Sequence, residues 1–144
     1  MKFKNLNKID KKPEKTLNMK VILFKNSIVP DLKQVTELVL FEFDEEIDFN
    51  KCENLELLVI QHYPFEMDLS KCKKLKTFRC GFYEKNLNLI GLNKLKTIKM
   101  TGYSKHINII KCRTMQHMKL SKCDLSYKIR CCPFFKIDDH EIYS

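Results

Sequence analysis

The chain has few of the residues that interrupt or link structural units. Its 144 residues include three glycines, four prolines and no tryptophan. Because glycine and proline mark turns and flexible linkers, their scarcity leaves no obvious linker and favours a single continuous unit. Long apolar runs are also missing, since none approaches the ~20 consecutive apolar residues that a membrane-spanning helix requires. Hydrophobic residues still make up 44% of the chain, which is enough for a core.

The first fifteen residues begin basic and stay polar, so they lack the apolar stretch of a secretory signal. We therefore expect a cytoplasmic protein, whose thiols stay reduced. The chain also lacks a glycine-rich phosphate loop, a clustered metal-ligand motif and a nucleophile motif. The sequence accordingly predicts a protein that is not an enzyme, with no catalytic residue, no metal site and no cofactor.

In place of such motifs the chain has a repeat of 20 residues, in which the phrase L-x-x-L-x-L returns in register. A fixed period of about 20 to 50 residues is typical of a solenoid. The alternation within the phrase predicts a strand with one buried face, stacked in parallel on the strand of the next coil. The three apolar columns of the phrase are Val35, Leu55, Leu75, Leu95, Met115 and Phe135; Leu38, Leu58, Phe78, Ile98 and Met118; and Leu40, Ile60, Cys80, Met100 and Leu120.

A shorter phrase of apolar, polar and apolar residues follows in each unit. It predicts a second short extended segment on the opposite wall, with its central Asp or Asn facing solvent. The stretch that comes next turns the chain back and is expected to form a single helical turn. The triplets are Ile47-Asp48-Phe49, Met67-Asp68-Leu69, Leu87-Asn88-Leu89, Ile107-Asn108-Ile109 and Tyr127-Lys128-Ile129.

Seven cysteines suggest disulfides or a metal site at first, but their positions favour a core role. Four of them share one column with two leucines, as small buried hydrophobic residues do. There is no C-x-x-C pair, and one cysteine per coil spreads the sulfurs along the solenoid axis instead of gathering four ligands. Oxidation could still join Cys52 to Cys72 or Cys112 to Cys132, because adjacent coils lie ~4.8 Å apart. This column is Leu32, Cys52, Cys72, Leu92, Cys112 and Cys132.

With these phrases, and with the cysteine three places before them in KCENLELLVI, KCKKLKTFRC and KCRTMQHMKL, the chain resembles the leucine-rich repeat family over residues 27–137. The short cysteine-containing class is the most similar. The resemblance implies a mainly β repeat solenoid of five to six coils, shaped as an arc or horseshoe. A parallel sheet would line its concave face, with short extended or single-turn segments on the convex side. The competing fold is a regular parallel β-helix, which has three strands per coil where the sequence suggests two.

One column departs from that family. The family's Asn or Cys, three places after the last strand leucine, is replaced by Phe43, Tyr63, Tyr83 and Tyr103, and only Cys123 fits. We expect these rings to form a stacked aromatic ladder in the turns, because ring pairs add about 0.5–1.5 kcal/mol each beyond burial.

The ends of the solenoid need caps, since a terminal coil otherwise exposes core and strand edges. Residues 1–26 are interpreted as a basic arm with an atypical capping strand at 19–24. Residues 138–144 are a tail, and an end-to-end dimer is possible if the tail leaves Phe135 and Met118 uncovered.

The outward strand positions predict where a partner binds, because the strand face of a solenoid is its main binding surface. The early coils place apolar side chains there, and the later coils place a basic stripe with flanking lysines. Thr36 is also assigned to an outward position. The predicted partner-binding residues are Phe41, Val39, Leu57, Val59, Lys76, Arg79, Lys96, Lys99 and Lys119.

Charge is distributed unevenly along the chain. Residues 27–54 hold two lysines and eight acidic residues, whereas residues 75–134 hold thirteen basic and two acidic residues. An apolar patch beside charge is the usual anatomy of an interface, so we expect a protein partner that is acidic or mixed apolar-acidic. Nucleic acid or an anionic surface is the alternative, supported by a pI of about 9.2. It is weaker because no aromatic residue is expected among the stripe's cations.

The four histidines occupy different positions and are not expected to converge on one site. His117 and Cys123 lie six residues apart, but an exposed histidine and a turn cysteine are far commoner than a catalytic pair. His62, His106 and His140 each fall at another position of the repeat.

Overall fold

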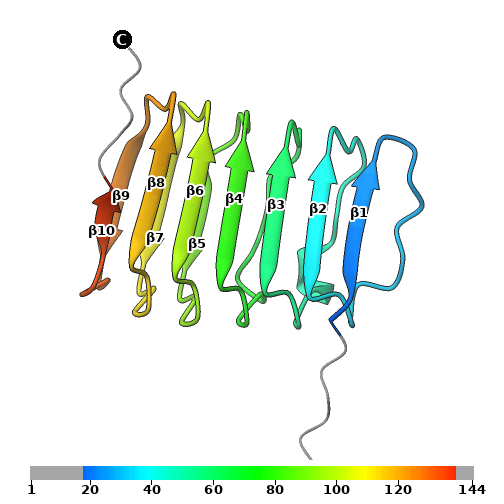
Figure 1. Cartoon of the computed structure of the whole chain (residues 1–144), viewed down its shortest axis with the longest axis horizontal. Coiled ribbons are helices and arrows are strands. Elements are labelled where there is room, and N and C mark those ends of the chain that lie inside the picture. Colours follow the sequence, from blue (N-terminus) through cyan, green and yellow to red (C-terminus); the bar gives the residue numbers. More distant parts are fainter. Residues whose placement is uncertain (1–17, 139–144) are drawn as a thin grey trace, which may run out of the picture.

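The repeat folds into a solenoid of parallel β-strands with about six turns and almost no helix, as a computed structural model describes it for residues 18–138. Seven strands stand in one row, and three strands form a second sheet behind them (Figure 1). The seven-stranded sheet contains β1 (Lys20–Phe24), β2 (Glu37–Phe41), β3 (Leu57–Gln61), β4 (Thr77–Gly81), β6 (Thr97–Thr101), β8 (His117–Ser121) and β10 (Lys136–Asp138). The second sheet contains β5 (Leu87–Ile90), β7 (His106–Ile110) and β9 (Ser126–Arg130).

The strand register follows the sequence period except at the two ends. From β2 to β8 each residue pairs with the residue 20 positions on, as Leu57 does with Thr77. The first coil is shorter, because Lys20 pairs with Glu37. The last is one residue short, because Ile137 and not Asp138 stands opposite Met118. The shorter last coil therefore keeps an apolar side chain in the inward column.

The three predicted columns of the strand phrase are confirmed up to the last coil, whereas Tyr127, in the shorter apolar phrase, is exposed and not inward as expected. Val35, Leu55, Leu75, Leu95 and Met115 have no exposed surface, and the other two strand columns are buried up to Leu120. The last coil is looser, since Ile129, Cys132 and Phe135 are only partly buried against the core. Alternate side chains of each strand point inward, so the 20-residue period determines which side chains of neighbouring coils contact one another in the core.

All seven cysteines are free thiols. Cys72 donates a weak hydrogen bond to the Phe49 carbonyl oxygen of the preceding coil at 3.6 Å, and Cys112 donates to Leu89 at 3.3 Å. Burial raises the pKa of Cys52 to about 11 and the pKa values of Cys72 and Cys80 to about 12. These thiols therefore stay protonated at neutral pH and pack as core residues.

The opposite wall is a sheet in the later coils only, which corrects the expectation of a second strand in every coil. In the early coils the carboxylates of Asp48 and Asp68 accept the backbone N–H groups of Asn50 and Ser70, at 3.1 and 3.0 Å. Such local bonds hold the chain in turns and compete with a strand ladder. The expected helical turn is present in one coil only, as the 3₁₀ helix η1 (Phe49–Lys51), which is the single helical segment among residues 18–138; the corresponding stretches of the later coils are turns.

The tyrosine column is buried, but the expected aromatic stacking between its rings is wrong. The described residues contain no ring pair between successive tyrosines. Each hydroxyl instead bonds the backbone of the preceding coil. Tyr63 accepts the Ile47 N–H at 2.9 Å, and Tyr83 donates to the Phe65 carbonyl at 2.8 Å. Tyr103 shares its proton between the Lys85 and His106 carbonyls, at 3.0 and 2.7 Å.

We expect Tyr63→Phe to lower the free energy of unfolding by about 1–3 kcal/mol, because the Ile47 N–H is then left buried without a partner. Urea unfolding followed by circular dichroism measures the change. Tyr127→Phe is the matched control, since Tyr127 is 52% exposed, and it should change stability by less than about 0.5 kcal/mol. Equal effects of the two substitutions would contradict the backbone role of Tyr63.

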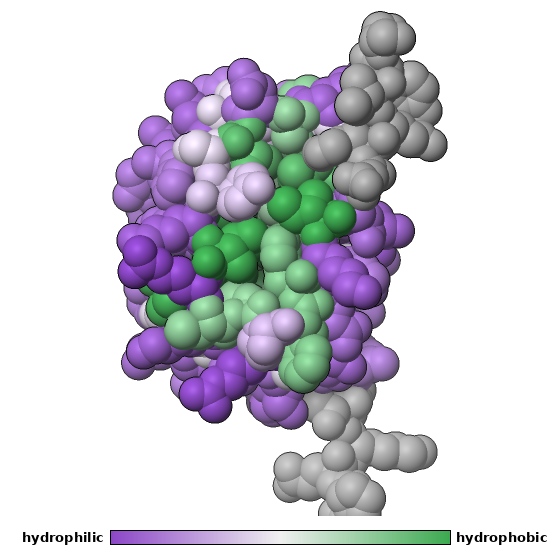
Figure 2. Space-filling view, turned by 90° about the vertical axis from the view of Figure 1, so that its left-hand side faces the viewer, coloured by the Kyte–Doolittle hydropathy of each residue, from purple (hydrophilic) through white to green (hydrophobic). Residues whose placement is uncertain are grey.

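The two ends of the solenoid differ. Strand β1, within the segment predicted as an arm and capping strand, pairs with β2 at the edge of the seven-stranded sheet, while residues 1–17 of that segment lie outside the described residues. At the other end, Figure 2 shows an apolar area bordered by hydrophilic residues. Tyr127 and Phe134 of the last coil are exposed, whereas Met118 is fully buried. The predicted tail falls outside the described residues from 139 on, as does His140.

No helix within residues 18–138 is long and apolar enough to cross a membrane.

Candidate functional site

The outward side chains of the seven-stranded sheet form continuous rows, because neighbouring strands are parallel and in register. The central row brings five predicted residues together. In order from β1 to β10 it contains Ile22, Val39, Val59, Arg79, Lys99, Lys119 and Asp138. The row changes from apolar to cationic between β3 and β4. We refer to the outward surface of this sheet as the strand face.

The apolar half of the strand face is larger than the sequence indicated. Val39 and Val59 stand side by side, with Phe41 and Leu57 in the flanking rows. Strand β1 adds Ile22 and Phe24, which are exposed, and the Phe24 ring meets Phe41 edge-on at 6.0 Å between centroids. A fixed 20-residue period misses both, because β1 and β2 are separated by only 17 residues. Aligning the similar strings VILF and LVLF would have found them.

The basic half places three like charges directly opposite one another. Arg79, Lys99 and Lys119 pair across β4, β6 and β8, whose axes lie ~4.8 Å apart. Like charges in this arrangement repel and destabilise the sheet. None of the three forms an ion pair within residues 18–138. An anionic partner would remove this repulsion.

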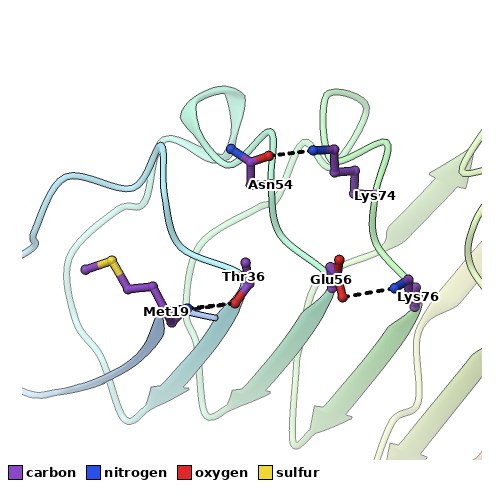
Figure 3. Close-up of polar contacts among 6 residues, drawn as sticks. All are labelled: Met19, Thr36, Asn54, Glu56, Lys74 and Lys76. Atoms are coloured by element: carbon purple, nitrogen blue, oxygen red, sulfur yellow. Dashed lines mark hydrogen bonds and ion pairs between the residues drawn. The ribbon is translucent and has the colours of Figure 1, made fainter. Parts of the chain in front are cut away.

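The flanking lysines differ from the stripe. Lys76 forms an ion pair with Glu56 of the preceding coil at 3.0 Å, so its charge is already balanced (Figure 3). Lys74 similarly donates to the Asn54 side chain at 2.6 Å. Lys96 is exposed and lies beside Lys76 at the start of the strands. The sequence could have predicted this ion pair, since Glu56 and Lys76 are 20 residues apart and therefore occupy the same position in neighbouring coils.

The outward assignment of Thr36 is wrong. Its side chain is 2% exposed. Its hydroxyl accepts the Met19 N–H at 3.0 Å and donates to the Met19 carbonyl at 3.3 Å (Figure 3). The backbone of the short first coil therefore covers the position that is open in later coils.

A hollow of about 320 Å³ opens on the strand face where the apolar and basic halves meet. It lies over Gly81, which has no side chain between Gln61 and Thr101 of the neighbouring strands. Val59, Arg79 and Lys99 also line it.

Phe82 borders this hollow as well, which corrects the expectation that no aromatic residue lies among the cations. The residue after each strand from β2 to β8 has a left-handed backbone, and at Phe82 φ is 50°. The Phe82 ring stacks on His62 at 4.9 Å with an interplanar angle of 4°. The sequence-based alternation does not extend past the strand ends, so it could not indicate where this ring lies.

The basic half ends at an acidic residue. A second hollow of about 290 Å³ is lined by Lys99 and Lys119 together with Thr97, His117 and Asp138. His117 Nδ1 lies 3.1 Å from the Asp138 carboxylate. Lys99 thus lines two hollows, one bordered by apolar and cationic side chains and one by side chains of both charges.

His117 and Cys123, which the sequence analysis weighed as a catalytic pair, form hydrogen bonds with different groups. His117 contacts Asp138, whereas the Cys123 thiol donates to the Met100 and Ser121 carbonyl oxygens. His106 bridges Ser126 and Asn108 on the other sheet, at 2.7 and 3.0 Å. Within the described part of the chain, no group of three or more acidic, histidine or cysteine side chains could hold a metal ion.

Comparison with known proteins finds no family model that matches this chain, and no curated protein that is similar to it.

Proposed function

We propose that the chain is a protein-interaction module whose strand face binds an acidic or mixed apolar-acidic protein. The observation that carries the proposal is the row of Arg79, Lys99 and Lys119, none of which forms an ion pair within residues 18–138, next to the apolar row of exposed Ile22 and half-buried Val39 and Val59. Carboxylates on a partner would relieve the repulsion between the cations, while its apolar side chains would cover the other half. An interface with an apolar part and a charged border is the common arrangement.

We also propose that the solenoid is a short leucine-rich repeat arc with the strand face on its concave side. The 20-residue register and the inward L-x-x-L-x-L columns support this assignment. A cytoplasmic location, an end-to-end dimer and the absence of enzymatic activity stay predictions.

Charge reversal tests the proposal directly. We expect Arg79→Glu/Lys99→Glu/Lys119→Glu to weaken binding of a labelled glutamate-rich peptide that contains phenylalanines by about 10- to 100-fold, because three surface ion pairs of about 0.5–1 kcal/mol each are lost. Val59→Glu should also weaken it. Fluorescence anisotropy measures the affinity, and circular dichroism confirms the fold.

The matched control carries the same charge change away from the strand face. Lys85→Glu/Lys105→Glu/Lys128→Glu replaces three exposed lysines outside the seven-stranded sheet, and it should bind the peptide as wild type does. If both triple variants lose affinity equally, net charge and not the strand face governs binding, and the proposal fails.

Nucleic-acid binding is the second candidate, because the aromatic ring of Phe82 lies beside Arg79 and Lys99. Single-strand binders combine such cations with stacking aromatics. For oligothymidine, the logarithm of the affinity should then fall with the logarithm of salt at a slope of about −2, given about −0.7 per phosphate for three phosphates. Absent or salt-independent binding eliminates this candidate.

A further inference from the structure

The hollow over Gly81 differs from the rest of the strand face. In the outward row that crosses it, Phe24, Phe41 and Gln61 come before Gly81, and Thr101 follows. The side chain is absent at one strand only, so the neighbouring side chains form walls around an opening of about 320 Å³. An opening of this kind is suited to a single inserted side chain.

The walls of the hollow are apolar on one side and cationic on the other. Val59 stands on β3, and Phe82 closes the end where the strands finish, while Arg79 and Lys99 continue the basic row beside the opening. No carboxylate borders the hollow. A group entering it thus meets apolar surface with two cations within reach.

Phe82 is held in a fixed position, although it is 45% exposed. Its ring lies between two neighbours in the same column. His62 of the preceding coil stacks on it at 4.9 Å, and Gly102 of the following coil packs so closely that an added Cβ would lie 2.7 Å from the ring. The stacked His62 occupies one face of the ring and leaves less of it for a nucleobase, while the exposed part of the ring can contact an apolar side chain.

We propose that the hollow at Gly81 receives one bulky apolar side chain of the acidic partner, while carboxylates next to that side chain bind Arg79 and Lys99. This inference rests on the proposed function. It specifies the recognised element as an aromatic or large aliphatic residue flanked by Asp or Glu in an extended segment. An anchor in a pocket with charges at its border is where interface energy concentrates.

Gly81 can be filled without disturbing the fold. A Cβ there would have ordinary contacts, with the Gln61 Cγ at 3.6 Å and the Ile60 carbonyl oxygen at 3.9 Å. Gly102 is unsuitable for the same test, because its φ is +63° and the Phe82 ring blocks the added atom. We therefore expect Gly81→Leu to fill the hollow and to leave Arg79 and Lys99 in place.

The test compares two labelled probe peptides, a run of glutamates with a central phenylalanine and the same run with a central glycine. Wild type should bind the phenylalanine peptide about 10- to 150-fold more tightly, because burying one such side chain contributes about 1.5–3 kcal/mol. Gly81→Leu should lose this preference and keep its affinity for the glycine peptide. Ser121→Leu adds the same side chain to the same row outside the hollow, and it should keep the preference.

The possible failures are distinguishable. If wild type binds both peptides equally, or if Gly81→Leu keeps the preference, the inference is overturned while charge reversal still tests the proposed function. If wild type binds neither peptide, or binds only oligothymidine, the proposed function and this inference fail together.

Discussion

Replacing Leu75 with alanine is expected to lower the free energy of unfolding by about 2–5 kcal/mol, which is the usual cost of a substitution that leaves a cavity in place of a buried leucine side chain. Leu75 has no exposed surface and belongs to the column that Leu55 and Leu95 continue on either side. Interiors are close-packed, so these neighbours cannot collapse fully into the space. Because domains are stable by only about 5–15 kcal/mol, the loss would be a large part of the total.

Urea unfolding measured by circular dichroism gives this change, with Lys94→Ala as the exposed control from the same coil. The control should stay within about 0.5 kcal/mol of wild type. Leu120→Ala, in the partly buried end of a neighbouring column, should cost less than Leu75→Ala because its surroundings are already open to solvent. A Leu120→Ala effect as large as that of Leu75→Ala would contradict the gradient of packing toward β10.

Alkaline pH is expected to unfold the protein through its buried thiols. Burial raises the pKa of Cys72 and of Cys80 from 9.0 to about 12, and that of Cys52 to about 11. Each thiol keeps its proton in the folded core at pH values where the unfolded chain has lost it. The stability it contributes is complete below pH 9 and is lost as the pH rises toward the folded-state pKa, by about 1.4 kcal/mol per pH unit and proton.

Urea midpoints collected at several pH values above 9 test this prediction. Cys72→Ala should reduce the slope of stability against pH by about one proton, whereas Leu75→Ala, which removes no titratable group, should lower stability and leave the slope unchanged. The buried tyrosines contribute at still higher pH, since burial also raises the pKa values of Tyr83 and Tyr103. A flat pH profile between about 9 and 11 would show that the thiols titrate normally.

The sequence could predict features that follow from the period alone. Inward residues such as Leu75 and Phe78 are buried because every coil repeats the same alternation, and Arg79, Lys99 and Lys119 align for the same reason. It could not predict features at breaks in the pattern. The short first coil buries Thr36 and exposes Phe24. The left-handed backbone of Phe82, the residue after β4, places the Phe82 ring at the hollow.

Side-chain hydrogen bonding explains the remaining differences. Asp48 and Asp68 bond their local backbone, whereas Asn88 and Asn108 bond each other across strands at 2.8 Å. The change from Asp to Asn at this position of the repeat thus coincides with the change from an irregular wall in the early coils to a sheet in the later coils. The tyrosine hydroxyls likewise bond backbone groups that a search for ring stacking does not consider.

The strand register has a consequence for how the protein folds. From β2 to β8, each strand pairs only with strands one coil away, so no pairing requires the closure of a long loop. Folding can begin at any pair of adjacent coils and extend toward both ends, one interface at a time. A duplicated coil inserted between β3 and β4 would pair with the same kind of strand on both sides. The solenoid could therefore lengthen by one coil while every strand still pairs only with its neighbours.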